Sequence, residues 1–235
     1  MFQKARFYHR MICSRHREEA LELNFVCKYL KPGMTAIDIG VYKGIYSYWM
    51  SKSVAETGIV IGFEPQDEFY QYMAKIKSSL NLANYKIEHL ALSDSEGSSV
   101  LFIPTDASKG KSWASLESKH SSEAEAVEVT TTTLDAYCEN NDLSPDFIKC
   151  DVEGHEYKVF RGGEILLRKV HPVLLFECKE VHLFEITMYD IFHYLKSLGY
   201  EGFVFSKDGL KKMHYYSEQE LQNIIEKSTR NFLFQ

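Results

Sequence analysis

The sequence predicts an α/β fold in which helices alternate with the strands of a mainly parallel sheet. Strand-like and helix-like runs alternate along most of the 235 residues, which is the pattern of βαβ units. A glycine-punctuated turn at residues 38–44 joins the first predicted strand to a helix. Acidic residues follow several strands, at the sheet edge where such folds bind ligands. We expect one domain over residues 1–235, because two full domains would be cramped in this length.

The individual elements follow from hydrophobic periodicity and from helix start and stop signals. Residues 1–30 are expected to form a helical extension, in which a helix at 18–30 ends at Lys31-Pro32-Gly33. Strands are predicted at residues 34–39, 58–64, 85–91, 145–151, 171–178, 200–206 and 230–235. Helices are predicted at residues 44–56, 66–80, 135–140, 154–168, 186–198 and 217–227, the third of them capped by the threonines that precede it.

Residues 104–125 form a polar segment between two extended runs, 98–103 and 126–131, which are expected to pair as a hairpin. Loops of this length are usually functional or disordered. Two interpretations stay open: an inserted lid-like loop that orders over substrate, or a mobile surface loop. The side chains that a lid would turn inward are Trp113, Ser115 and Leu116.

Charge disfavours one class of partner. The formal net charge of -6 gives no general electrostatic attraction to nucleic acid, so a nucleic-acid substrate is disfavoured. The N-terminal region is nevertheless locally basic, with Lys4, Arg6, His9, Arg10, Arg15, His16 and Arg17. This cluster is either the solvated face of the helical extension or an arm that contacts phosphates or a membrane surface.

Cysteine usage and hydropathy indicate the compartment. The five cysteines are an odd number without a C-x-x-C pair, which indicates buried free thiols in a reducing environment. No apolar run is long enough to span a bilayer, and residues 1–17 lack the apolar core of a signal peptide. We therefore expect a cytoplasmic protein without a membrane span, and a homo-oligomer stays open.

The glycine-punctuated turn carries the first chemical signal, because glycine lets the backbone approach a ligand closely. Glu64 follows the next strand and is placed to accept hydrogen bonds from a ribose. A dinucleotide site would need a glycine where Tyr42 stands, and Asp38 would repel a diphosphate. S-adenosylmethionine (SAM) carries an ammonium and a sulfonium, which Asp38 would attract. The alternative is that Gly40 and Gly44 are ordinary loop glycines and Glu64 a solvated strand end.

A second signal lies at residues 145–156, where a buried-type strand runs into a cluster of ionisable groups and then a helix. The carboxyl ends of strands in a doubly wound sheet share one edge, where ligands bind. The acids that fall at such ends are Asp38, Glu64, Asp94, Asp151, Glu153 and Glu177. The alternative is that acids here cap helices or complement helix dipoles, as we expect for Glu156.

On these residues the chain resembles the FkbM family of SAM-dependent methyltransferases, over about residues 20–235. The motifs that carry the resemblance are Asp38-Ile39-Gly40 to Gly44, Phe63-Glu64-Pro65, Ala91-Leu92-Ser93-Asp94, Thr133-Leu134-Asp135, Ile148 to Glu156, Gly162-Gly163 and Phe176-Glu177. The lysine-x-Asp-Val-Glu-Gly-x-Glu motif at 149–156 is the most particular to the family. Val41 and Tyr42 depart from it, because a small residue and an asparagine are usual there.

The resemblance implies a class I methyltransferase (Rossmann-like) fold, with a seven-stranded, mainly parallel sheet in the order 3-2-1-4-5-7-6 and helices on both faces. The groups that would hold the amino and carboxylate ends of SAM are Asp38, Gly40, Tyr42 and Gly44. Glu64 would bind the ribose, Ser93 or Asp94 would lie near the adenine, and Asp151 would lie nearest to the sulfonium. The implied activity is O-methylation of a sugar, polysaccharide or secondary-metabolite hydroxyl.

Methyl transfer to a hydroxyl requires alignment of the acceptor oxygen with the methyl group and a base near that oxygen. Asp151, Glu153 and His155 are the candidates, in that order. His155 is equally well explained as a helix-surface residue. No metal is predicted, although Asp151, Glu153 and Glu177 could alternatively hold Mg²⁺ through oxygen ligands.

Two other functions stay open. The first is a nicotinamide-dependent oxidoreductase on a Rossmann-like sheet, which Tyr42 weakens because it stands in the pyrophosphate path. The second is a SAM-binding interaction protein without catalysis, which the presence of Asp38, Glu64 and Asp151 disfavours. For the methyltransferase, the expected partner is a small-molecule or carbohydrate acceptor.

Overall fold

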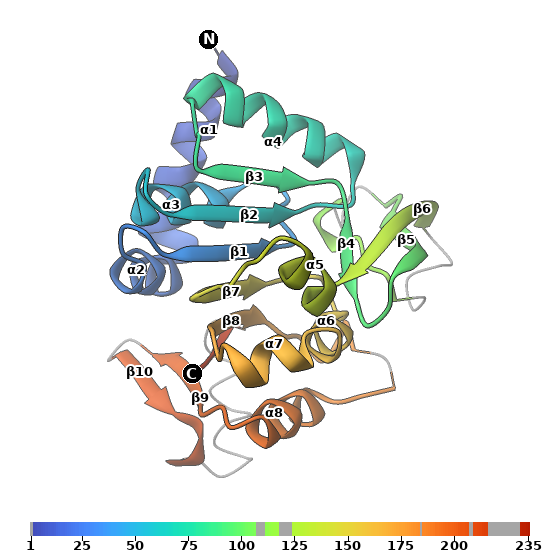
Figure 1. Cartoon of the computed structure of the whole chain (residues 1–235). Helices are drawn as coiled ribbons and strands as arrows, with labels where there is room; N and C mark the ends of the chain where they lie inside the picture. The colour runs from blue at the N-terminus through green and yellow to red at the C-terminus, as the bar shows by residue number, and fades with distance from the viewer. Residues whose placement is uncertain (1, 107–110, 118–123, 184, 207–208, 216–230) are drawn as a thin grey trace.

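A computed structural model describes residues 2–106, 111–117, 124–183, 185–206, 209–215 and 231–235 (Figure 1). Within this part, eight strands form the main sheet in the order β10-β9-β11-β8-β7-β1-β2-β3. Their bounds are β1 Thr35–Ile39, β2 Ile59–Phe63, β3 Tyr85–Glu88, β7 Phe147–Cys150, β8 Val173–Glu177, β9 Gly202–Ser206, β10 Gly209–Lys212 and β11 Asn231–Phe234. Neighbouring strands from β3 to β8 run parallel, and β11 runs antiparallel between β8 and β9.

The predicted fold class is confirmed, because the seven predicted strands are all present and adopt the order 3-2-1-4-5-7-6. The predicted count is one strand too small. β10 adds an antiparallel edge strand beside β9. Its sequence has a single apolar residue, Leu210, between glycine and lysines, so periodicity carries no strand signal there. Pairing with β9 decides its conformation instead.

Helices cover both faces of the sheet (Figure 1). Their bounds are α1 Phe2–Cys13, α2 Ala20–Tyr29, α3 Ile45–Val54, α4 Asp67–Leu80, α5 Leu134–Asn140, α6 Glu156–Arg161, α7 Glu164–Lys169 and α8 Met188–Ser197, with a π-helical turn η1 at Ser14–Glu18 and 3₁₀ turns at Lys111–Trp113 and Met213–Tyr215. The helix predicted at 154–168 is in fact two, divided at Gly162 and Gly163, because glycine is a poor helix former. A Cβ on Gly162 would lie 2.0 Å from the Ser93 carbonyl oxygen of β4. The helix predicted at 217–227 lies outside the described residues.

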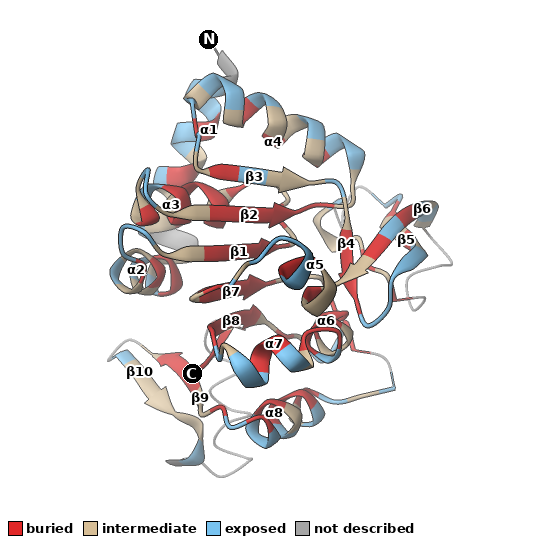
Figure 2. Cartoon of the chain, in the orientation of Figure 1, coloured by how far each residue is buried: buried red, intermediate tan, exposed pale blue. Residues whose placement is uncertain are grey.

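Side chains alternate across β1, so its neighbouring residues belong to two different cores. Ile37 packs with residues of α5, α6, α7 and α8 on one face. Ala36 packs with residues of α1, α2, α3 and α4 on the other. Figure 2 shows the central strands buried along most of their length. Because both faces are covered, the central strands are almost continuously apolar, and Asp38 and Lys149 are the charged exceptions on β1 and β7.

A smaller sheet lies beyond the carboxyl ends of β1 and β2 (Figure 1). It consists of β4 Ala91–Ser93, β6 Ala124–Thr133 and β5 Gly97–Pro104, in that spatial order. β5 and β6 pair antiparallel, with Val100 opposite Glu128, which confirms the predicted hairpin. The strand predicted at 85–91 ends at Glu88, and Ala91 begins β4. β4 pairs with a strand 40 residues later, and this distant partner redirects the chain.

The five cysteines are free, and Cys138, Cys150 and Cys178 are buried as expected. The expectation of buried thiols is wrong for Cys13 and Cys27, which are half-buried because they lie on α1 and α2, helices with one face toward solvent. None of the helices in the described part of the chain has the length and apolar character that a bilayer crossing requires.

Candidate active site

A cavity opens beyond the carboxyl ends of β1, β2 and β7, where sheets of this class bind ligands. The turn after β1 lines it with Gly40 and Tyr42, and the end of β2 adds Glu64. The loop after β7 adds Asp151, Val152, Glu153 and His155. The apolar lining comes from Phe63, Pro65, Leu90, Ala91, Leu92 and Leu101. The cavity therefore has an apolar part beside groups of carboxylates.

Gly40 brings the ends of β1 and β7 into close contact. Its φ is +82°, a conformation that favours glycine, and a Cβ here would lie 1.9 Å from the carbonyl oxygen of Asp151. Gly44 also has a positive φ, +74°, but lies outside the lining of the described cavity. A Cβ on Gly44 would lie 2.2 Å from Met73 Cε, so this glycine serves the packing of α3 against α4. The Tyr42 ring packs against Phe69, with 4.4 Å between ring centroids.

Glu64 is 3% exposed and is held by two backbone donors. The N–H groups of Tyr42 and Gln66 donate to its two oxygens at 2.7 and 2.9 Å. Burial raises the pKa of Glu64 to about 7, although the two N–H donors favour the ionised form. A carboxylate has about four lone-pair sites, so Glu64 can still accept hydrogen bonds from a ligand in the cavity.

Asp38 lies behind the cavity and not in its lining. It is 1% exposed, accepts a hydrogen bond from Ser47 Oγ, and its Oδ1 has no hydrogen-bond partner among the described residues. Lys149 is its partner in the register of β1 and β7, so both side chains leave the same face of the sheet. Burial raises the pKa of Asp38, and the nearby Lys149 ammonium opposes this shift.

Three carboxylates meet at the ends of β7 and β8, because oxygens of Asp151, Glu153 and Glu177 all lie within 4.8 Å of one another. Lys149 Nζ lies 3.1 Å from Asp151 Oδ2, and Lys179 Nζ lies 2.8 Å from Glu177 Oε1. Two lysine ammonium groups thus offset two of the three carboxylate charges. That no metal binds at these carboxylates stays a prediction.

The two sides of this cluster differ in acidity. Burial raises the pKa of Asp151, but the Lys149 ammonium, with its hydrogen bond, and the Lys179 ammonium together leave the pKa below its ordinary value. Burial and the neighbouring Asp151 charge raise the pKa of Glu177. Glu153 makes a close contact with His182 Nδ1 and lies 3.8 Å from Lys179 Nζ, and its φ of +53° is a strained conformation for a non-glycine residue.

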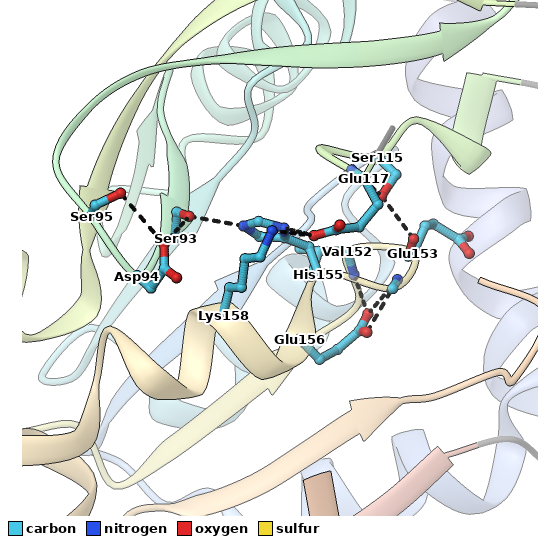
Figure 3. Close-up of polar contacts among 11 residues, drawn as sticks. Ser93, Asp94, Ser95, Ser115, Glu117, Val152, Glu153, His155, Glu156 and Lys158 are labelled. Carbon is cyan, nitrogen blue, oxygen red and sulfur yellow. Dashed lines mark hydrogen bonds and ion pairs between the residues drawn. The ribbon is translucent and has the colours of Figure 1, made fainter. Parts of the chain in front are cut away.

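His155 contacts Ser93 and Glu117, which lie 62 and 38 residues before it in the sequence. Figure 3 shows its ring between Ser93 and Glu117. Its Nε2 lies 2.9 Å from Ser93 Oγ and its Nδ1 lies 2.6 Å from Glu117 Oε1, which also pairs with Lys158 Nζ at 3.0 Å. His155 is 4% exposed, so the alternative of a helix-surface histidine is wrong. Asp94 directly follows Ser93, the last residue of β4. It is exposed and lies outside the cavity lining.

The loop after β7 is shaped by Glu156. Its carboxylate accepts backbone N–H groups of Val152 at 3.0 Å and Gly154 at 3.1 Å (Figure 3). Burial raises the pKa of Glu156 to about 8. A Cβ on Gly154 would lie 2.3 Å from the His182 carbonyl oxygen. Glu156 thus holds backbone in place, in line with the structural role expected for it.

Residues 111–117, here called the strap, cross the cavity. Ser112, Ala114, Ser115 and Leu116 line it. The backbone of Ser115 pairs with Phe102 of β5 at 2.8 and 3.1 Å, and its Oγ donates to the Glu153 carbonyl oxygen at 2.8 Å. Gln66 Nε2 donates to the Lys111 carbonyl oxygen at the other end. Ser115 and Leu116 face the cavity as a lid requires, whereas Trp113 packs against the His182 ring at 5.1 Å.

The sequence alone predicts no site role for Lys149, Glu117 or Glu19. Lys149 stands two residues before Asp151, and in a strand this spacing puts both on one face. That spacing was therefore a usable signal. Glu117 and Glu19 had none, because each reaches the site from a segment distant in the sequence.

The chain is similar to known proteins in sequence and in fold. Residues 38–201 match the family model described as the methyltransferase FkbM domain. A methyltransferase FkbM from Methylobacillus flagellatus KT has a similar fold, with a TM-score of 0.55 and 14% identity over 86% of this chain and 44% of that chain. This chain thus spans less than half the length of that protein. A SAM-dependent methyltransferase from Aquifex aeolicus is similar at TM-score 0.50 and 16% identity, over 98% and 96% of the two chains. No curated protein sequence matched.

Proposed function

This chain belongs to the FkbM methyltransferase family, and we propose that it transfers the methyl group of SAM to a hydroxyl oxygen of a sugar, a polysaccharide or a secondary metabolite. Family membership supports SAM-dependent methyl transfer over nicotinamide-dependent oxidation. The proposed site rests on one observation: Gly40, Glu64 and Asp151 line the same cavity.

The residues around the cavity fit SAM. Gly40 lines the cavity and has no side chain, so the amino-acid end of a ligand can approach the backbone of the turn. Glu64 offers acceptor sites to ribose hydroxyls, and its backbone donors fix its orientation. Pro65 and Leu92 offer an apolar surface for a purine ring. When bound, SAM supplies an electrophilic methyl group.

The adenine contact is reassigned in this proposal. Asp94 is exposed and Ser93 is engaged with His155, and neither lines the cavity. We therefore place the adenine against Pro65 and Leu92. Ser93 then serves to hold His155.

Among the three candidate bases, Asp151 has the best position for the acceptor. Both ring nitrogens of His155 are engaged, and the Glu153 carboxylate is turned to His182 and Lys179. We assign to Asp151 the role of binding the acceptor hydroxyl. Its carboxylate accepts the hydrogen bond, orients the oxygen and receives the proton as the bond from the methyl carbon to the acceptor oxygen forms and its bond to sulfur breaks.

Glu177 lies beside Asp151 and takes part in this proton transfer. Its carboxylate oxygen lies within 4.8 Å of an Asp151 oxygen, and its pKa is raised to about 7, whereas that of Asp151 is lowered. An ionised Glu177 can therefore take over the proton that Asp151 receives from the acceptor. Glu153 and His155 then have a holding role, because they anchor the strap over the cavity through the Glu153 carbonyl oxygen and through Glu117.

The proposed function is tested in two steps. Calorimetric titration with S-adenosylhomocysteine (SAH), compared with NADH and repeated with and without Mg²⁺, is expected to give Mg²⁺-independent binding of SAH alone. A screen with labelled SAM and hydroxylated sugars, polysaccharides and secondary metabolites then seeks the acceptor. Transfer to a nitrogen or carbon atom would overturn the O-methyltransferase proposal. SAH binding without transfer to any acceptor would favour the non-catalytic alternative.

Replacing Glu64 with glutamine is expected to weaken SAH binding and to remove its pH dependence. Loss of a charged hydrogen-bond acceptor costs about 1.5–3 kcal/mol, or about 10–100-fold in affinity. Since the pKa of Glu64 is raised to about 7, wild-type affinity should rise as the pH increases through 7 and the carboxylate ionises. Calorimetry at several pH values checks this. A Glu64→Gln protein whose affinity still rises through pH 7 would contradict the assignment.

The same pKa shift predicts the pH dependence of stability without ligand. The pKa of Glu64 is raised above its ordinary value of 4.5, so the folded chain binds a proton that the unfolded chain releases. The stabilisation is complete below about pH 4.5 and is lost as the pH rises through about 7. The melting temperature of the Glu64→Gln protein should fall less than that of the wild type over this range.

Replacing Ser115 with alanine is expected to loosen the strap. The change removes the hydrogen bond to the Glu153 carbonyl oxygen, worth about 1 kcal/mol, so SAH affinity should fall about fivefold. Ser98→Ala is the matched control, because Ser98 lies exposed on the neighbouring strand β5. Equal SAH affinities for the two variants would show that the strap does not close over the cofactor.

A further inference from the structure

Lys149 is a buried cation next to Asp151, the proposed base. Its side chain is 5% exposed, and its Nζ lies 3.1 Å from Asp151 Oδ2. It is also the register partner of Asp38, so the aligned strands β1 and β7 place one ammonium beside two carboxylates. Burial lowers the pKa of Lys149, but the carboxylates of Asp151, Asp38 and Glu19 more than offset this and raise it. Lys149 therefore stays charged.

Further acids face Lys149 from the helical side. Its Nζ lies 5.0 Å from the centroid of the Tyr46 ring on α3. Glu19, between η1 and α2, acts electrostatically on both Lys149 and Asp151, and Glu22 follows it on α2. One oxygen of Glu19 and one of Glu22 are buried without a hydrogen-bond partner among the described residues. These acids lie outside residues 38–201, so the N-terminal segment adds negative charge that the matched domain lacks.

On its other side Asp151 faces Glu153 and Glu177, with Lys179 between them. Lys179 is shared by these two carboxylates. The cation in hydrogen-bond contact with Asp151 is Lys149. Carboxylates this close repel one another, so without Lys149 one of them would take up a proton. Glu177 already has a raised pKa, and loss of the Lys149 contact would raise the pKa of Asp151 as well.

We propose that Lys149 is a positioning residue, which holds the Asp151 carboxylate ionised and directed to the cavity and thereby sets the preference for SAM over SAH. The two ligands differ by a methyl group and the single positive charge of the sulfonium. An ionised carboxylate in the cavity favours the charged methyl donor over the neutral thioether product. Lys149 thus contributes to product release. This inference rests on the proposed role of Asp151.

The test measures the ratio of the SAM and SAH dissociation constants by calorimetry across about pH 5.5 to 8.5. This ratio cancels contributions common to both ligands, such as that of Glu64. Glu177, whose pKa is raised to about 7, titrates in this range, so every protein in the comparison carries Glu177→Gln. With Lys149 present in that background, the preference for SAM should stay constant. In Lys149→Met it should fall by about tenfold between about pH 8 and about pH 6, because Asp151 takes up a proton.

Three variants separate charge from packing. Lys149→Arg keeps the charge and should restore a constant ratio. Lys149→Met combined with Asp151→Asn should give a ratio that no longer depends on pH. Lys212→Met removes a lysine that pairs with Glu201 at the far edge of the sheet and should behave as the Glu177→Gln protein. A Lys149→Met protein with a constant ratio, or a Lys149→Arg protein that behaves like Lys149→Met, would overturn the inference.

A second measurement does not depend on the folding of Lys149→Met. Carboxyl ¹³C NMR of the wild type follows the ionisation of Asp151 directly, with its resonance identified by its loss in Asp151→Asn. Titration below about pH 4 agrees with the inference, and a midpoint above about pH 5 overturns it. A wild type that binds neither SAM nor SAH overturns the proposed function itself. A wild type that binds both with no change in Lys149→Met overturns only the role of Lys149.

Discussion

Replacing Asp151 with asparagine should reduce methyl transfer by about a thousandfold, within the range typical for loss of a catalytic base. The amide keeps the shape of the side chain but cannot take the acceptor proton. The fold should survive, because Lys149 still faces Asp38 and Glu19. Turnover is measured with labelled SAM and the acceptor from the screen, and folding by circular dichroism.

The control for this variant is Asp142→Asn. Asp142 is exposed, and its φ of +52° is a conformation that asparagine also tolerates. Asp142→Asn therefore makes the same chemical change at a residue outside the cavity lining. Its turnover should equal that of the wild type. An Asp151→Asn protein that turns over as fast as the control would remove Asp151 from the mechanism.

Replacing Gly40 with alanine should abolish measurable cofactor binding. The added Cβ would lie 1.9 Å from the Asp151 carbonyl oxygen, a backbone atom that cannot rotate away, and the φ of +82° adds strain of about 1–2 kcal/mol. The turn must shift, and the Tyr42 N–H then leaves Glu64. We expect a loss of SAH affinity of about 100-fold or more, or about 3 kcal/mol, measured by calorimetry.

Gly97→Ala is the matched control for Gly40→Ala. Gly97 also has a positive φ, +136°, but no heavy atom lies within 4 Å of the position of a Cβ there. The substitution therefore introduces backbone strain without a collision. It should lower stability by about 1 kcal/mol and leave SAH affinity unchanged. If both variants bind SAH equally well, the contact between Gly40 and Asp151 does not shape the cofactor site.

Local patterns were sufficient to predict much of the fold. Ala36 and Ile37 belong to cores on opposite faces of the sheet, as the alternation of side chains along a strand requires. Thr133 caps α5 as predicted, because its hydroxyl accepts the Ala136 N–H at 3.0 Å, an interaction that spans only three residues. Such features depend on neighbours in the sequence.

Predictions failed where a distant segment determined the local structure. Periodicity favoured one strand over 85–91, but Ala91 pairs with Thr131 of β6 and begins a separate strand. β10 has no apolar alternation and forms by pairing with β9. In both cases tertiary pairing outweighed local propensity, which amounts to about 1 kcal/mol or less per residue.

The fold class, the family and the acids that follow several strands could be predicted from local periodicity and contiguous motifs. Which of those groups lie together depends on how distant segments pack. Lys149 meets Asp38 through the register of two strands, and His155 meets Ser93 and Glu117 across 62 and 38 residues. Contacts of this kind arise from the packing of whole segments, whose free energy comes from burial and hydrogen bonding and leaves no local pattern in the chain.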